Sequence, residues 1–207
     1  MTSNTTGRLF VISAPSGAGK TTLVNKLMAA DSDLRFSVSY TTRQQRHNEV
    51  DGHDYNFIKK ERFQKMVADN AFLEHAEVFD NFYGTPRKEV QELLSAGYNV
   101  ILEIDWQGAE QVRSNMPDCE SIFILPPSVI ELTQRLRGRA TDSNAVITRR
   151  LADSLADLTH WVDFDYAVIN DQLDQAVTAL QNILAGDGTQ QKTSSKTIKN
   201  AAKQLLN

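Results

Sequence analysis

Residues 13–22 have the residue types and the spacing of a phosphate-binding loop: Ser-Ala-Pro-Ser-Gly-Ala-Gly-Lys-Thr-Thr. Gly17 and Gly19 can take backbone conformations that a Cβ would penalise, which lets the N–H groups of the loop converge on one anion. Lys20 can place an ammonium on the outer phosphates of a nucleotide, and the hydroxyl of Thr21 suits Mg²⁺. The stretch therefore predicts a site for a nucleoside triphosphate.

The flanking residues fit this interpretation. The apolar run 9–12 is typical of a buried strand, and residues 23–30 have apolar side chains at helical spacing. A helix that begins at the loop adds unpaired N–H groups and the positive end of its dipole. Ala14 stands where the strict motif has its first glycine. The alternative is a bare turn that binds nothing, but such a turn does not need Lys and Thr at these offsets.

A second cationic stretch, residues 41–46, contains Arg43 and Arg46. Two guanidinium groups can hold phosphate oxygens in a planar, bidentate way that lysine cannot match. Tyr55 and Tyr83 can add hydroxyl donors. The stretch predicts a site for an anionic phosphate acceptor, and a solvated basic loop stays open as the alternative.

Two acids, Glu74 and Asp105, lie at the edges of apolar strands. Guanine presents N1–H and an amino group as donors on one edge, so carboxylates match it, whereas adenine presents an acceptor. A site built on such hydrogen bonds rejects the mismatched base. Structural pairing of these acids with arginines stays open.

A group of arginines surrounds a break in the helical pattern at residues 138–144. A hinged, arginine-rich lid suits phosphoryl transfer, because stabilisation of the transferred group is mostly positional and electrostatic. Ordinary helix-surface charge is the alternative. The arginines are Arg135, Arg137, Arg139, Arg149 and Arg150.

The pattern of elements predicts an α/β fold with a parallel sheet flanked by helices. Core strands are expected at 9–12, 99–105, 121–125 and 166–169. Helices are expected at 86–97, 106–116, from Ser128, at 145–161 and around 176–186. Residues 36 to about 90 contain short strands (36–40, 55–57, 72–78), a helix at 60–70 and a turn at 81–85, which predicts an inserted, mostly-β lobe. Ligands of such sheets bind beyond the carboxyl ends of the strands.

Composition narrows the class of protein. The chain has 207 residues, a net charge of −4 and one cysteine, Cys119. The charge argues against a general nucleic-acid binder. No apolar run approaches the roughly 20 residues of a membrane span, and the first residues form no targeting signal, so we expect a cytoplasmic protein. Oligomeric state stays open. In the lysine-bearing tail 187–207, a C-terminal helix is expected, with an anionic or protein contact as the alternative.

Taken together, these motifs resemble the guanylate kinase family, the bacterial ATP:GMP phosphotransferases. The resemblance covers residues 8 to about 185. The matching stretches are 12–20, 36–43, 52–57, 72–74, 83–85, 102–108, 126–128 and 135–139. Ala14 is also usual in this family.

The resemblance implies a role for individual residues. Arg43, Arg46, Tyr55 and Tyr83 match binders of the GMP phosphate, and Ser39, Glu74, Thr85 and Asp105 match the set that reads guanine. Arg135, Arg139 and Arg150 match lid arginines near the transferred phosphate, with Lys20 and Arg43 also catalytic. The ATP side is matched by Ala14, Pro15, Ser16, Gly17, Ala18, Gly19, Lys20, Thr21, Thr22, Asn170 and Asp171, with Thr21 on Mg²⁺.

The resemblance also implies a fold: a P-loop NTPase core, an inserted small mostly-β GMP-binding lobe and a helical lid, in a single domain. The core is expected at 8–35, 91–126 and 162–186, the lobe at 36–90, the lid at 127–161 and the tail at 187–207. Departures from the family pattern are Gln44-Gln45, Ala140 and Gln172. The implied reaction is Mg²⁺-dependent transfer of the ATP γ-phosphate to GMP.

A binding module is the rival interpretation. Guanylate-kinase-like domains of scaffold proteins keep the fold, bind peptides and lack catalysis. Such domains typically lose residues of the phosphate-binding loop, whereas Lys20, Thr21 and Arg43 are present here. The enzyme is therefore the favoured interpretation.

Overall fold

The structure is a computed structural model that describes residues 6–78, 80–138 and 144–206. The described residues form two compact units. The first unit draws on residues 1–10, 33–102 and 107–119, and the second on residues 11–32, 103–106 and 120–207. Each unit is therefore assembled from separate segments of the chain.

The strands are β1 (Leu9–Ser13), β2 (Leu34–Phe36), β3 (Tyr40–Thr41), β4 (Asn56–Phe57), β5 (Phe72–Val78), β6 (Asn81–Pro86), β7 (Asn99–Glu103), β8 (Glu120–Leu125) and β9 (Tyr166–Ile169). The α-helices are α1 (Lys20–Ala30), α2 (Lys60–Ala68), α3 (Arg87–Ser95), α4 (Trp106–Asn115), α5 (Val129–Arg137), α6 (Asn144–Asp157), α7 (Leu173–Ala185) and α8 (Lys196–Leu206). Two 3₁₀ helices are η1 (Leu158–Asp163) and η2 (Gly188–Gln191). Within the described ranges, no helix is long and apolar enough to cross a membrane.

The larger sheet has the strand order β2-β7-β1-β8-β9. The pairs β2–β7 and β8–β9 are parallel. Val100 donates its backbone N–H to the carbonyl of Arg8, and Ile104 donates to Ile12. Partner numbers that rise together are the pattern of parallel strands. The predicted parallel sheet with flanking helices is therefore confirmed.

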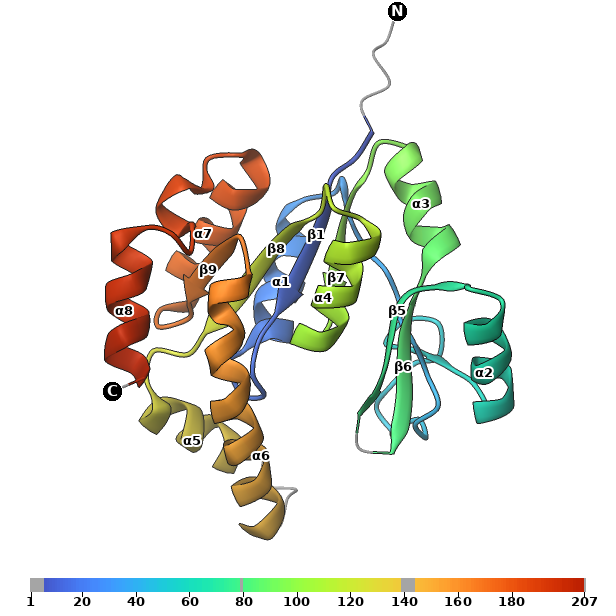
Figure 1. Ribbon diagram of the computed structural model, residues 1–207, viewed down its shortest axis with the longest axis horizontal. Coiled ribbons are helices and arrows are strands. Elements are labelled where there is room, and N and C mark those ends of the chain that lie inside the picture. The colour runs from blue at the N-terminus through green and yellow to red at the C-terminus, as the bar shows by residue number, and fades with distance from the viewer. Residues whose placement is uncertain (1–5, 79, 139–143, 207) are drawn as a thin grey trace, which may run out of the picture. The chain divides into compact units, whose positions relative to one another are not determined.

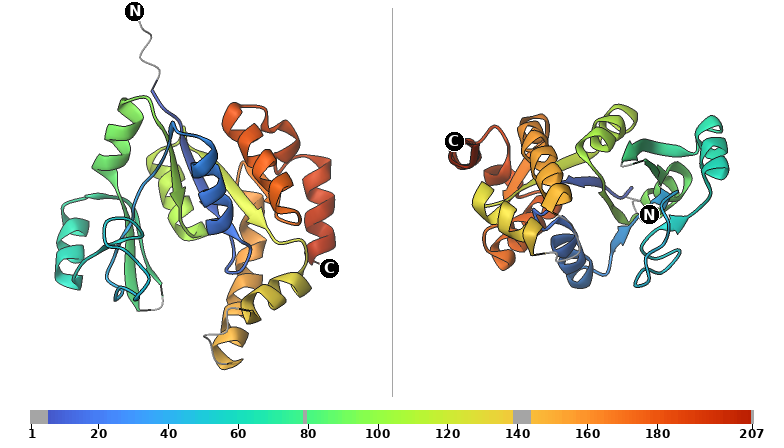
Figure 2. Two further views of the ribbon diagram at one scale, coloured as in Figure 1. Left: turned by 180° about the vertical axis from the view of Figure 1, so that it is seen from behind. Right: turned by 90° about the horizontal axis from the view of Figure 1, so that it is seen from below.

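In the second unit, α7 packs on β9 and lies beside α1 (Figure 2). Gly186 ends α7 in the left-handed conformation, with φ of 92°. The helix α8 buries one apolar face, formed by Ile198, Ala202 and Leu205. The expected C-terminal helix is thus confirmed, and its lysines stay exposed on the opposite side.

The first unit contains a smaller sheet of order β4-β3-β6-β5, in which β5 and β6 form an antiparallel hairpin (Figure 1). Three phenylalanine rings join it to α2. Phe63 of that helix stacks on Phe72 and Phe82, with ring centroids 4.6 and 5.5 Å apart. Phe63 and Phe72 are buried and Phe82 is half-buried. Aromatic pairs of this kind stabilise by about 1 kcal/mol beyond area burial, so the short strands have a core of their own.

Three sequence predictions about elements were wrong in detail. Residues 81–85 are not a turn but most of β6, where a Cβ on Gly84 would lie 2.9 Å from the ring of Phe72. The expected strand 36–40 is two strands, because β2 pairs with β7 whereas β3 belongs to the smaller sheet. The expected helix 145–161 ends as α6 at Asp157 and tightens into η1, which buries Leu158 and Trp161.

Candidate functional site

The loop between β1 and α1 has the geometry of a phosphate-binding loop. Gly17 and Gly19 have φ of 91° and 90°, in the left-handed region that favours glycine. The space around both glycines is also tight, so an added side chain would displace its neighbours. A Cβ on Gly17 would lie 3.1 Å from Leu136, and one on Gly19 would lie 2.4 Å from Nδ2 of Asn170. The sequence predicted the conformational need for glycine, whereas the need for space depends on packing.

Lys20 and Thr21 begin α1, and both side chains reach the carboxyl end of β7. The Nζ of Lys20 donates to the carbonyl oxygen of Ile104 at 2.8 Å. The Thr21 hydroxyl donates to Oε1 of Glu103 at 2.5 Å. The ammonium and the hydroxyl are thus held in defined positions at the start of the helix. Thr22 follows them and is exposed.

Glu103 is the residue of this site that sequence reasoning missed. Sequence analysis selected Asp105 from the same strand end, because an acid there can read a base. The useful signal was the position of Glu103 at the carboxyl end of a buried parallel strand, where ligands of α/β sheets bind. Its contact with Thr21 depends on the pairing of two segments 82 positions apart.

Asn170 contacts the phosphate-binding loop, and Arg135 contacts Asn170. The side-chain amide of Asn170, which is 6% exposed, donates to the carbonyl of Ala18 at 2.7 Å. Arg135 donates through NH2 to the carbonyl of Asn170 at 3.3 Å, and its Nε donates to Glu131 at 2.9 Å. The structure therefore places one predicted site residue, Asn170, on the loop and a second, Arg135, beside it, while Asp171 is exposed.

The helix α6 contacts the same loop. Ser154 is buried and donates its hydroxyl to the carbonyl of Ser16 at 3.2 Å. Arg150 lies one turn before Ser154 on α6, and α6 packs against α5, which carries Arg135. Two of the predicted lid arginines are thus on helices that pack against each other. Arg139 and Ala140 lie outside the described residues.

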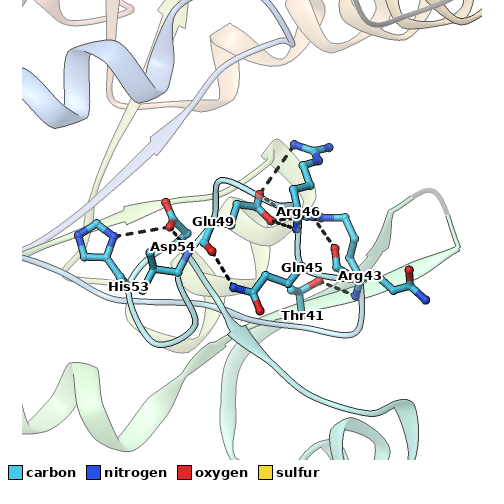
Figure 3. Close-up of polar contacts among 9 residues, drawn as sticks. Thr41, Arg43, Gln45, Arg46, Glu49, His53 and Asp54 are labelled. Atoms are coloured by element: carbon cyan, nitrogen blue, oxygen red, sulfur yellow. Dashed lines mark hydrogen bonds and ion pairs between the residues drawn. The ribbon is translucent and has the colours of Figure 1, made fainter.

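A second cationic cluster lies in the first unit, in the loop that follows β3 (Figure 3). Arg43 donates NH1 and NH2 to the two carboxylate oxygens of Glu49, at 3.0 and 2.8 Å. The backbone N–H of Arg46 also donates to Glu49, at 2.8 Å. The guanidinium of Arg43 lies 5.4 Å from the ring centroid of Tyr55 and contacts the hydroxyl of Tyr83. The structure therefore gathers the four residues that were predicted to bind the acceptor phosphate.

The charges of this cluster reinforce each other. The hydrogen bond from Arg43 lowers the pKa of Glu49 below its ordinary value of 4.5, against the opposing effect of burial. The same bond raises the pKa of Arg43, with a smaller contribution from Tyr83. Both groups are consequently charged at neutral pH. The prediction of a solvated basic loop is wrong for Arg43, whose side chain is only 16% exposed.

Glu74 and Thr85 meet across the β5–β6 hairpin. Glu74 is 4% exposed and accepts a hydrogen bond from the Thr85 hydroxyl at 2.6 Å. A buried carboxylate of this kind can also accept hydrogen bonds from the N–H groups of a base. Ser39 is half-buried just before β3, in the same unit. Asp105 is half-buried after β7 and belongs to the second unit.

Comparison with known proteins adds an independent line of evidence. The family model described as guanylate kinase matches residues 6–187. A guanylate kinase of Methylococcus capsulatus is 54% identical over 180 residues, which is 87% of this chain and 88% of that protein. One of Escherichia coli is 49% identical over 183 residues, with the same shares covered. The crystal structure of guanylate kinase from Anaplasma phagocytophilum superposes with a TM-score of 0.74 at 34% identity, covering 90% of this chain and 88% of that one.

Proposed function

Because the chain belongs to the guanylate kinase family, we propose that it transfers the γ-phosphate of ATP to GMP and releases ADP and GDP. One observation carries the proposal beyond the family assignment. A phosphate-binding loop alone serves many nucleotide enzymes, but this chain also gathers Arg43 and Arg46 beside Tyr55 and Tyr83. Such a cluster fits the phosphate of an acceptor that is itself a nucleotide.

The donor nucleotide is assigned to the loop 14–19 and the start of α1. Backbone N–H groups and the helix dipole favour the phosphates of ATP, and Lys20 supplies a full positive charge. Asn170 and Asp171 are assigned to the adenine side. Because Asn170 also holds the carbonyl of Ala18, it links this side to the shape of the loop.

A magnesium ion is assigned to the carboxyl end of β7, where Glu103 meets Thr21. Thr21 and Glu103 present a hydroxyl and a carboxylate oxygen 2.5 Å apart, and oxygen donors of this kind suit Mg²⁺, which keeps several waters. When bound with ATP, Mg²⁺ neutralises charge that develops on the phosphates. The contact between Thr21 and Glu103 holds these two donors at one place.

The acceptor GMP is assigned to the first unit. The guanidinium groups of Arg43 and Arg46 hold its phosphate, and Tyr55 and Tyr83 add hydroxyl donors. Ser39, Glu74 and Thr85 of this unit read the guanine edge, where the carboxylate of Glu74 accepts from N1–H and the amino group. Asp105, which belongs to the second unit, stays a prediction from the family resemblance. AMP would leave Glu74 facing an acceptor, which is costly for a buried carboxylate.

Transfer needs little covalent work from the protein. The acceptor phosphate is already anionic, so its oxygen attacks the γ-phosphorus in line without a general base, and the bond to the ADP oxygen breaks. The lid arginines Arg135, Arg139 and Arg150 stabilise charge on the transferred group. We assign closure, which excludes water and prevents ATP hydrolysis, to residues 36–90 and 127–161. A cytoplasmic location stays a prediction.

The proposal is tested by measuring ADP release from Mg·ATP with and without GMP, and with AMP in place of GMP. We expect turnover that depends on GMP and is far slower with AMP. ADP release that does not respond to GMP would contradict the proposal.

Base selection has its own test in the first unit. Glu74→Gln replaces an acceptor with an amide and should reduce the GMP/AMP ratio of kcat/KM by about 10- to 100-fold. Glu77→Gln on the same strand is the matched control, because Glu77 is exposed. An unchanged ratio in Glu74→Gln would place base reading elsewhere.

A further inference from the structure

Glu49 is the centre of the cationic cluster, although its charge is opposite to what a phosphate site needs. Its side chain is 12% exposed and that of Arg43 is 16% exposed. Oε1 accepts from Arg43 NH2 and Oε2 accepts from Arg43 NH1. The two side chains thus form a bidentate, largely buried ion pair, which is drawn in Figure 3.

The geometry of the guanidinium shows which donors this pair uses. An arginine has five N–H donors: two on NH1, two on NH2 and one on Nε. NH1 donates to Glu49 and to the carbonyl of Gln44 at 2.8 Å, and NH2 donates once to Glu49. Glu49 therefore occupies the end of the fork. These bonds leave Nε and the second hydrogen of NH2, on the side of the fork, and the hydroxyl of Tyr83 also bonds to this guanidinium. Two neighbouring guanidinium donors have the spacing for two phosphate oxygens.

Glu49 also shapes the main chain that carries the second arginine. Its carboxylate accepts from the backbone N–H of Arg46, its backbone N–H donates to the Arg46 carbonyl at 3.1 Å, and its carbonyl accepts from Gln45 at 2.6 Å. The guanidinium of Arg46 lies 3.9 Å from Oε1 with its side chain 64% exposed. One acid thus fixes the fork of Arg43 and the turn that presents Arg46.

We propose that Glu49 is a positioning residue for the acceptor phosphate, holding Arg43 by the end of its fork while the side of the fork and Arg46 bind the phosphate. This inference rests on the proposed function. Two guanidinium groups repel each other, and Glu49 reduces the local charge from +2 to +1, so the cluster exists before substrate arrives. The opposite role, in which Glu49 mimics phosphate and leaves when GMP binds, would also break its hydrogen bond to the main chain.

The test compares Glu49→Gln with wild type and with Asp54→Asn. Asp54 is a control in the same loop, because its carboxylate accepts from the backbone of Val50 and pairs with His53, while its replacement removes the same charge as that of Glu49. Dissociation constants for GMP and for guanosine are measured by calorimetry, and kcat and both KM values by ADP release. Guanosine lacks the phosphate, so it isolates binding of the base.

We expect Glu49→Gln to weaken GMP binding about 10- to 100-fold, with guanosine affinity and the KM for ATP within twofold of wild type. Asp54→Asn should leave all of these within twofold. If Glu49→Gln does not fold, Glu49→Asp keeps the charge and shortens the reach, and should weaken GMP binding severalfold.

Unchanged or tighter GMP binding in the folded variant would overturn the positioning role. An equal loss of guanosine affinity would also overturn it, because that would indicate general damage to the first unit. The proposed function fails separately, if the wild-type protein shows no GMP-dependent release of ADP.

Discussion

The two anion sites proposed for the described residues are built in different ways. The phosphate-binding loop at residues 14–19 relies on main-chain N–H groups, whose direction is set by two glycines at positive φ. The arginine loop, residues 41–49, relies on long side chains, whose direction is set by a buried carboxylate. The first site is made of backbone and the second of side chains.

This difference decides what each site is sensitive to. A backbone site loses little conformational entropy when it binds, but it has no room for a Cβ. A side-chain site must hold rotamer-rich arginines, which costs up to about 2 kcal/mol each, and so it needs a partner that orders them beforehand. Substitutions that add atoms should therefore damage the loop 14–19 most, and substitutions that remove a charge should damage the arginine loop most.

The largest expected effect comes from the one full charge of the backbone site. Lys20→Met should lower kcat by about 10²- to 10³-fold, because the ammonium stabilises charge on the transferred phosphate. Lys26→Met, on the exposed side of the same helix, should stay within twofold. Turnover and thermal melting of both variants check this. A near-normal kcat for Lys20→Met would remove Lys20 from the catalytic set.

The next effect concerns the space around a glycine of the backbone site. Gly19→Ala should lower the free energy of unfolding by about 2–5 kcal/mol, since left-handed strain adds to displacement of the Asn170 amide. Gly52→Ala, also at positive φ but with nothing within 4 Å of the new Cβ, should cost only about 1–2 kcal/mol. Urea denaturation measures both. Equal losses in the free energy of unfolding would show that the packing around Gly19 does not add to the cost of the substitution.

The smallest effect tests the charge dependence of the arginine loop. The pKa of Glu49 is lowered by Arg43, so the stability that the ion pair provides is present above pH 4.5 and is lost as pH falls through the lower, folded pKa. The free energy of unfolding of wild type should therefore exceed that of Glu49→Gln by about 1–3 kcal/mol at pH 7, and this difference should shrink below pH 4.5. Urea denaturation between pH 3 and 7 measures it, and a difference independent of pH would contradict the ion pair.

Much of the fold followed from local patterns. The strand 72–78 and the strand at 121–125 are confirmed as β5 and β8, and Ser128 caps α5 by accepting from the N–H of Glu131. The mistakes occurred where neighbours outweigh local propensity. Gly84 argued for a turn, but it lies in β6 because the ring of Phe72 fills the place of a side chain.

The candidate site divides in the same way. Residue types and spacing were enough to propose Lys20, Thr21, Arg43 and Arg46, because phosphate chemistry dictates which side chains can serve. Glu49 and Glu103 were not predicted as site residues. Each is an ordinary surface-type acid in the sequence, and its importance comes from the partner that it meets.

What the sequence determined by itself is therefore the set of groups proposed to bind phosphate and the alternation of strands and helices. Both depend on short-range order: the identity of neighbours along the chain and the period of apolar residues. Tertiary structure alone decided how those groups are aimed, through contacts such as Glu103 to Thr21 and Asn170 to Ala18. Such contacts join residues 82 and 152 positions apart, and no local pattern encodes a distance that exists only after the chain has folded.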